Sequence, residues 1–281
     1  HLKSCRHLAL LKSGLILKCA RSLGSRFCVV PYENLKEGRL IRDVPVAGVK
    51  NLRELVECLK NPEPYLKREI QEEIPSIINT DMGMDFSDIE GQEGAKRAAE
   101  IAVSGFHNLL LIGPPGTGKT MLARRLPTIM PGLGFEEKLE LTRIYSIAGL
   151  LSREHPLIDE RPFRSPHHTS TPQAIAGGGR NPRPGEITLA HKGVLFLDEM
   201  PEFSRASLEL LRQPMEDKVI QIARASGTYN FPADFMLCAA MNPCPCGYYP
   251  DLNRCTCTAG EITHYMGKIS LEKPLSRNLN V

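Results

Sequence analysis

The sequence lacks long hydrophobic runs, a strong charge surplus and internal repeats. No apolar stretch in its 281 residues approaches the ~20 residues that a membrane-spanning helix needs, so we expect no membrane association. The net charge of +3 does not indicate a nucleic-acid-binding protein, and any such contact has to come from local basic patches. The 42% hydrophobic content is typical of a globular chain, and the length is enough for about two domains.

Acidic residues are absent from residues 1–30, which contain several lysines and arginines. Leu8, Leu11 and Leu15 fall near helical spacing, while Lys12 interrupts the apolar core that a secretory signal would need. Two interpretations stay open at this point. The segment is either an organelle transit peptide or one helix of a first domain.

A glycine-rich loop is the most specific motif in the chain. An apolar run at 108–112 precedes it and a helix-type run at 121–126 follows, which is the context that a G-x-x-x-x-G-K-[ST] phosphate loop needs. Backbone N–H groups and the positive end of the helix dipole then face a phosphate chain. Lys119 is expected to reach the β- and γ-phosphates, and Thr120 to hold Mg²⁺. The predicted ATP-binding residues of this segment are Gly113, Pro114, Pro115, Gly116, Thr117, Gly118, Lys119, Thr120 and Met121.

Two further apolar runs end in polar residues. Residues 193–197 predict a buried strand, and Asp198 and Glu199 follow it at the carboxyl end, where open α/β sheets bind ligands. Asp198 is the expected Mg²⁺ partner of Thr120, and Glu199 is placed to polarise the attacking water. Residues 235–241 predict another buried strand, after which Asn242 is expected to bind the γ-phosphate or the water. Asn242-Pro243 is also turn chemistry, and both roles can hold at once.

The nine cysteines fall into two groups. Five are isolated and are expected to be reduced thiols, as in a cytosolic protein; they are Cys5, Cys19, Cys28, Cys58 and Cys238. Cys244-x-Cys246 and Cys255-x-Cys257 are clustered, and four thiolates can form a tetrahedral zinc site. Because C-x-C is shorter than the usual ligand spacing, a disulfide and free structural thiols stay open as alternatives.

Residues 161–191 are polar and rich in glycine, proline and histidine, and a long loop of this kind usually carries function. Gly177 to Gly179, with Arg180 and Arg183, suit a flexible basic loop that grips a phosphate backbone without reading sequence. His167 and His168 are metal-ligand types. Adjacent side chains diverge in most backbone conformations, so packing or hydrogen bonding is the preferred role.

These motifs together resemble an AAA+ ATPase core, and more narrowly the Mg-chelatase-like, ComM-like group. The stretches that carry the narrower resemblance are 161–169, 185–191, 224–227 and 242–247. The resemblance implies an α/β fold in which a parallel sheet is flanked by helices, over residues 86–281, with an insertion in the second core helix at about 161–191. It also implies a partial Lon-protease-like α+β domain at 1–60. Pro62, Pro64 and Pro75 interrupt the stretch that follows and predict a linker at 61–85. Gln92 then lies near the adenine.

The first part of the predicted core and its end depend on finer patterns. Asp88 is a plausible N-cap of an entry helix whose small apolar face includes Ala99, Ala102 and Val103. Relatives continue after residue 270 into a segment with a probable trans-acting arginine and then a helical lid. This chain departs from that pattern, so the lid is expected to be missing and the chain truncated or frame-shifted. Arg277 and Arg212 are candidate substitutes for the arginine.

The predicted function is ATP hydrolysis by a cytoplasmic AAA+ motor that remodels or translocates DNA. Catalysis is assigned to Glu199, Lys119 and Asn242, with ATP and Mg²⁺ as ligands and zinc as a further candidate. The resemblance implies a homo-hexamer in the full-length parent. Two alternatives stay open: the ATPase subunit of a metal-chelatase complex, and a truncated nucleotide-binding module without turnover.

Overall fold

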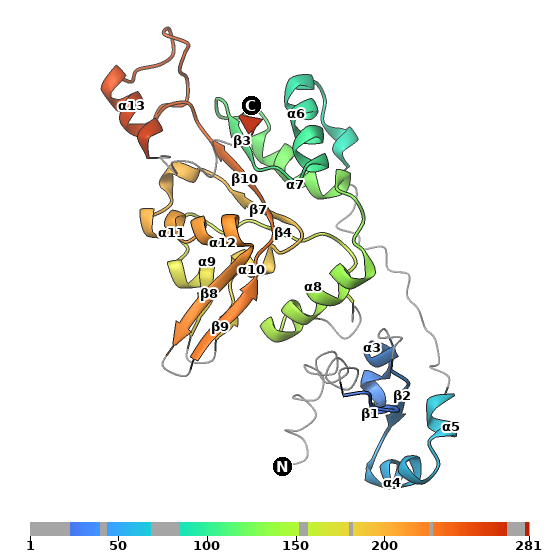
Figure 1. Cartoon of the computed structure of the whole chain (residues 1–281). Helices are drawn as coiled ribbons and strands as arrows, with labels where there is room; N and C mark the ends of the chain where they lie inside the picture. Colours follow the sequence, from blue (N-terminus) through green and yellow to red (C-terminus); the bar gives the residue numbers. More distant parts are fainter. Residues whose placement is uncertain are drawn as a thin grey trace. The chain divides into compact units, whose positions relative to one another are not determined.

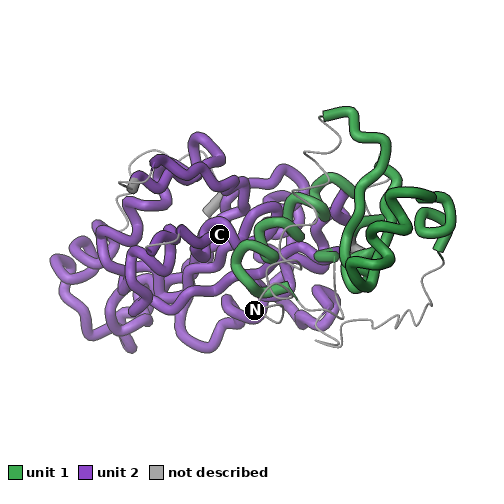
Figure 2. Tube along the Cα trace, turned by 90° about the horizontal axis from the view of Figure 1, so that it is seen from below, with its two compact units in different colours: residues 1–79, 135–158 green, residues 80–134, 159–281 purple. Residues whose placement is uncertain are grey.

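The computed structural model describes residues 23–39, 44–68, 85–151, 157–179, 182–224, 227–268 and 279–280. The chain divides into two compact units, 1–79 with 135–158 and 80–134 with 159–281 (Figure 2). Segment 135–158 thus groups with the first unit, although its neighbours in sequence belong to the second. Most of the basic start, much of the predicted linker, Arg180 and Arg277 lie outside the described residues.

The first unit contains a small parallel sheet, in which β1 (Cys28–Pro31) pairs with β2 (Val46–Val49). Its helical elements are η1 (Tyr32–Asn34), α3 (Leu35–Arg39), α4 (Leu52–Lys60), α5 (Glu63–Leu66) and α8 (Phe135–Ala148). A small core holds them together, made of Val30, Leu35, Val46 and Leu139. The Lon-protease-like origin of this unit stays a prediction.

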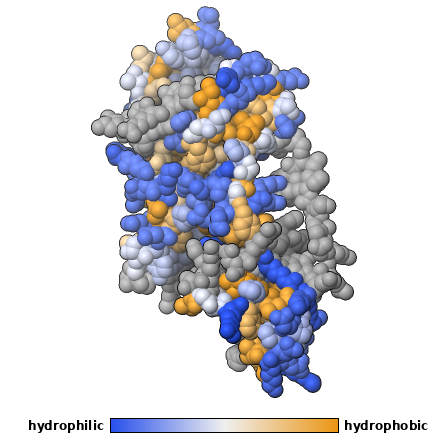
Figure 3. All heavy atoms as spheres, turned by 45° about the vertical axis from the view of Figure 1, so that its right-hand side comes forward, coloured by the Kyte–Doolittle hydropathy of each residue, from blue (hydrophilic) through white to orange (hydrophobic). Residues whose placement is uncertain are grey.

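Exposed apolar side chains occur in the first unit. Leu52, Val56 and Leu59 lie three or four residues apart on α4 and are 73%, 52% and 63% exposed. On the face drawn in Figure 3, hydrophobic residues lie in small groups among hydrophilic ones. Among the described helices, none combines the length and the apolar character required to cross a bilayer.

The second unit is built on a five-stranded sheet in the order β11-β3-β10-β7-β4, in which every neighbouring pair is parallel. Its strands are β3 (Leu109–Ile112), β4 (Phe163–Arg164), β7 (Val194–Leu197), β10 (Met236–Met241) and β11 (Leu279–Asn280). The strands predicted from the apolar runs are β3, β7 and β10, the three central ones. The structure confirms the predicted α/β class with a parallel sheet flanked by helices.

Alternating side chains of the central strands enter two separate cores, which is why these strands are apolar throughout. On one face, Phe196 and Cys238 pack with Leu122 and Leu126 of α7 (Lys119–Ile129) and with α6 (Glu93–Ser104). On the other face, Leu195 and Leu237 pack under shorter helices (Figure 1). Those helices are α9 (Pro172–Ala176), α10 (Glu186–Leu189), α11 (Arg205–Glu209) and α12 (Arg212–Asp217). The same core includes Met200 of η3 (Met200–Glu202), Ile220 of β8 (Val219–Arg224) and Tyr265 of α13 (Ala259–Gly267). β8 forms an antiparallel hairpin with β9 (Gly227–Pro232).

The segment 161–191 is not one irregular loop. It contains β4, α9, the hairpin of β5 (Gly177–Gly178) and β6 (Arg183–Pro184), and α10. Each of these elements is two to five residues long, too short to give a periodic pattern. The side chain of Thr171 caps α9 by accepting a hydrogen bond from the Ala174 N–H at 3.2 Å.

The structure corrects the predicted N-cap at Asp88. Asp88 lies in η2 (Phe86–Asp88), whose N-cap is Asp85, and the two residues form a capping box in which the Asp85 N–H donates to Asp88 Oδ2 at 2.8 Å. The Asp85 carboxylate also accepts the Ser87 N–H at 2.8 Å. The entry helix α6 begins later, at Glu93 after Gln92. Both aspartates have the side chain that a cap needs, so residue type alone did not distinguish them.

A partly buried ion-pair cluster lies at the amino ends of β7 and β10. Asp234 accepts hydrogen bonds from Lys192 at 2.7 Å and pairs with Lys218 at 3.0 Å. Burial raises the pKa of the Asp234 carboxyl, but the two lysines more than offset this and leave the pKa below its ordinary value. Its ion pairs therefore stabilise the fold above the ordinary pKa of about 4, and this contribution is lost as the pH falls through the lowered folded-state pKa.

Asp234→Asn is expected to lower the free energy of unfolding by about 1–3 kcal/mol at neutral pH, because two ammonium groups lose their charged partner. The difference from the unchanged protein should shrink at an acidic pH below the lowered folded-state pKa of Asp234, where both forms carry a neutral side chain. Denaturant unfolding at neutral pH and at the acidic pH measures this difference in the free energy of unfolding. Asp217→Asn, at an exposed residue at the end of α12, is the control. A difference that does not depend on pH would contradict the electrostatic explanation.

Candidate functional site

The phosphate-loop motif forms a turn between β3 and α7 at the carboxyl edge of the sheet. Gly116 and Gly118 have φ values of +79° and +83°, a left-handed conformation that favours glycine. The hydroxyl of Thr117 donates to the Pro114 carbonyl at 2.9 Å and closes the turn. Gly118 is the N-cap of α7, so the loop ends on the N–H groups of an 11-residue helix. This arrangement offers backbone donors to an anion.

Lys119 points back into this loop. Its ammonium donates to the carbonyls of Gly113 at 2.7 Å and Pro114 at 2.8 Å, and to Asn242 Oδ1 at 3.4 Å. Burial lowers the pKa of Lys119, and the nearby carboxylate of Asp198 partly counters that shift. The structure thus places the predicted lysine and the predicted strand-end asparagine next to each other, although 123 residues separate them.

Thr120 and Asp198 meet across the ends of β3 and β7. The Thr120 hydroxyl donates to Asp198 Oδ2 at 2.8 Å, and both side chains are partly buried. The other carboxylate oxygen of Asp198 accepts the Glu199 N–H at 3.0 Å, which fixes its orientation. A hydroxyl and a carboxylate are the hard oxygen donors that Mg²⁺ prefers, so the donor set fits that ion.

Glu199 sits in an unusual backbone conformation. Its φ of +50° is left-handed, which is uncommon for a residue with a side chain and is often found at functional sites. Its carboxylate lies 3.7 Å from Nδ1 of His168, and the centroid of the His168 ring lies 4.1 Å from that of His167, with the two rings tilted by 34°. His168 also meets the edge of Phe203. The histidine pair thus has ring contacts and one carboxylate close to it, and its packing or hydrogen-bonding role stays a prediction.

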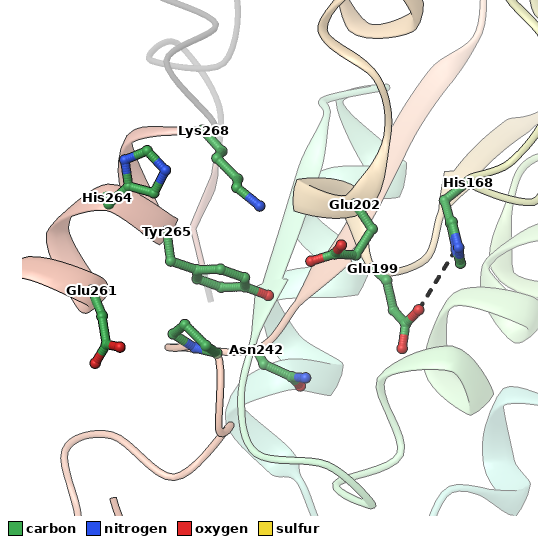
Figure 4. Close-up of a pocket in the computed structure, with 9 residues that line it drawn as sticks. His168, Glu199, Glu202, Asn242, Glu261, His264, Tyr265 and Lys268 are labelled. Atoms are coloured by element: carbon green, nitrogen blue, oxygen red, sulfur yellow. Dashed lines mark ion pairs between the residues drawn. The ribbon is translucent and has the colours of Figure 1, made fainter. Parts of the chain in front are cut away.

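A pocket of about 530 Å³ opens beside these residues (Figure 4). His168, Glu199 and Asn242 line one part of it, and side chains of α13 line the other, among them Tyr265. The remaining lining residues are Glu202, Pro245, Glu261, His264 and Lys268. Burial raises the pKa of Tyr265, as does the charge of Glu202. Sequence reasoning missed the contribution of α13, and no signal near Tyr265 pointed to it.

The four clustered cysteines come together between β10 and α13. All four Sγ atoms lie within 4.8 Å of one another, and none is in a disulfide. Among the described residues, no other group of three or more His, Cys, Asp or Glu side chains is arranged so that it could hold a metal ion. The N–H groups of Tyr248 and Thr256 donate to Cys246 and lower the pKa of that thiol to about 6. The spacing that weakened the zinc interpretation is thus compatible with one four-sulfur site.

Other predicted site residues are not joined to this constellation. Gln92 is the N-cap of α6, with a φ of +55°, and Met121 is 38% exposed on the first turn of α7. Arg183 is exposed on β6, and Arg212 is exposed at the start of α12. Whether Gln92 contacts a base stays a prediction.

Comparison with known proteins agrees with this geometry. Residues 85–280 match the protein family described as magnesium chelatase, subunit ChlI. Among curated proteins, the uncharacterized protein Rv2897c of Mycobacterium tuberculosis is 45% identical over 244 residues, which cover 86% of this chain and 47% of that protein. Competence protein ComM of Haemophilus influenzae is 41% identical over 252 residues, 89% of this chain and 49% of its own length. The uncharacterized protein YifB of Escherichia coli is 50% identical over 186 residues, 66% and 36% of the two chains.

The chain spans about half the length of the first two of these relatives. The match to the family, however, extends over well more than half of this chain and includes the phosphate loop, the Asp198–Glu199 strand end and Asn242. This confirms the resemblance stated from the motifs. The chain belongs to the magnesium chelatase, subunit ChlI, family.

Proposed function

We propose that this chain binds ATP with Mg²⁺ and hydrolyses it, and that hydrolysis drives the movement or remodelling of DNA. The main support for ATP binding and hydrolysis is the 2.8 Å hydrogen bond between Thr120 and Asp198, which joins the phosphate loop to the acidic end of β7. Family membership supports the same conclusion, since the motifs are those of an AAA+ ATPase. Thr120 and Asp198 would hold Mg²⁺, which supplies charge neutralisation at the phosphates.

Each of these residues has a separate role in phosphoryl transfer to water. The loop amides and Lys119 bind the β- and γ-phosphates, Glu199 accepts or polarises the proton of the attacking water, and Asn242 helps to position it. His168 would hold the Glu199 carboxylate until a nucleotide is bound. Such catalysis is mainly positioning and electrostatic stabilisation.

Two observations support DNA as the target. Arg183 is exposed on the β5–β6 hairpin, where its guanidinium is available to a phosphate backbone. A relative at 41% identity bears the name competence protein ComM. We propose a ring assembly as well, with exposed Arg212 as the candidate finger toward a neighbouring nucleotide; such a residue is worth a factor of roughly 10³–10⁵ in rate.

The family description favours one second candidate, the ATPase subunit of a metal-chelatase complex. ATPase rate measured against protein concentration, with and without single-stranded DNA, separates the two. We expect the rate per chain to rise with concentration and with DNA. Hydrolysis that DNA does not change would overturn the DNA assignment and favour the chelatase. Normal ATP affinity with negligible hydrolysis at every concentration would reduce the chain to a nucleotide-binding module.

A further inference from the structure

The sulfur atoms of the cysteine cluster lie at distances from one another that are close to those in a tetrahedral zinc site. Zn–S bonds of about 2.3 Å in a tetrahedron place sulfur atoms about 3.8 Å apart. Cys244 lies 3.3 Å from Cys246 and 3.8 Å from Cys255, and Cys246 lies 3.6 Å from Cys255. A disulfide would require a sulfur–sulfur distance of about 2.05 Å in one pair of cysteines. It would not explain why the other two cysteines lie at the same place.

The chain around the sulfurs is held in this shape by its own turns. The Gly247 N–H donates to the Cys244 carbonyl at 2.9 Å, and the Tyr249 N–H donates to the Cys244 sulfur at 3.4 Å. A turn precedes the second cysteine pair, Cys255 and Cys257. In this turn the Cys255 N–H donates to the Asp251 carbonyl at 2.8 Å. Backbone hydrogen bonds to sulfur are the kind of outer contact that orients metal ligands.

The same turn touches the nucleotide site. A Cβ atom added at Gly247 would lie 2.7 Å from Cδ of Pro115 in the phosphate loop and 3.8 Å from Cγ of Asn242. Gly247 also has a φ of +86°, a left-handed conformation that favours glycine. Glycine is therefore needed here both because it has no Cβ atom and because of its backbone conformation. Asn242 in turn accepts the hydrogen bond from Lys119 at 3.4 Å. A continuous line of contacts therefore runs from the cysteines to the phosphate-binding lysine.

We propose that Cys244, Cys246, Cys255 and Cys257 bind one structural Zn²⁺, and that the zinc-held turn fixes Asn242 and Pro115 in the geometry that ATP binding needs. The first half stands on the sulfur geometry alone. The second half rests on the proposed nucleotide site. With four cysteine ligands the zinc would have no open coordination position and would take no part in the reaction. Its role would be to stabilise the turn that contacts the nucleotide site.

Metal analysis of the purified full chain tests the first half. We expect one zinc per chain, retained by Cys28→Ser and lost from Cys257→Ser. Cys28 is the matched control, because it is a half-buried free cysteine in β1, outside the cluster. Co²⁺ substitution should give the visible absorption of tetrahedral sulfur coordination. Zinc well below one equivalent together with no such absorption would overturn the site.

Titration with a fluorescent ATP analogue tests the second half. Cys257→Ser is expected to weaken binding about tenfold. Gly247→Ala should weaken binding while keeping its zinc, because its methyl group would displace Pro115. Should Cys257→Ser fail to fold, zinc removal from the unchanged protein by a chelator and zinc re-addition give the same comparison. Equal ATP affinity with and without zinc would overturn the coupling. Failure of the zinc-loaded protein to bind ATP would instead overturn the proposed function and leave the zinc site intact.

Discussion

Glu199→Gln is expected to lower the ATPase rate about 10²–10⁴-fold and to leave ATP affinity unchanged. Glutamine keeps the shape of the side chain but cannot accept a proton from water. Glu199 makes no hydrogen bond through its carboxylate to the phosphate loop among the described contacts, and this carboxylate lies 3.7 Å from His168 Nδ1. The loss should therefore fall on the chemical step. Phosphate release and analogue titration on the same preparation measure the two quantities separately.

Glu209→Gln is the control for this substitution. Glu209 is an exposed acid at the end of α11 and does not line the pocket, so both quantities should stay at their original values. A Glu199→Gln protein that hydrolyses ATP at nearly the original rate would contradict the assignment. A protein that loses ATP binding as well would show that the Glu199 carboxylate acts in the ground state and not in the chemical step alone.

The sequence was sufficient to predict the parts of this site that are local. β3, the glycine turn and α7 follow one another within a short stretch, and an apolar run bounded by glycines is a strong signal. The fully apolar patterns of β7 and β10 also predicted burial on both faces. Both strands do contribute to the two cores on opposite faces of the sheet.

The parts that escaped prediction depend on contacts between distant segments. β4 is only Phe163–Arg164, and its pairing with β7 decides that it is a strand. The approach of His168 to Glu199 and of Gly247 to Pro115 requires the sheet to be assembled first. Residue type suggested a metal or a packing role for the histidine and could not identify its partner. The same limit applied to Asp85 and Asp88, where both side chains were suited to capping.

Lys119→Ala is expected to weaken ATP binding by about 2–5 kcal/mol, roughly 30- to 5,000-fold in Kd. The Lys119 ammonium lies within 2.8 Å of the Gly113 and Pro114 carbonyls, at the centre of the loop that would surround the phosphates. Removing it leaves the negative phosphates and Asp198 with no nearby cation from the loop.

Arg124→Ala is the matched control for this change, because Arg124 is an exposed cation on the same helix and makes no contact with the loop in the described part of the chain. Calorimetric titration with ATP and magnesium compares the two variants. If Lys119→Ala bound ATP as tightly as Arg124→Ala, the phosphate-binding role of the loop would be wrong. The roles proposed for Asp198, Glu199 and Asn242 would then have no substrate to act on, since each depends on a triphosphate held at the end of β3.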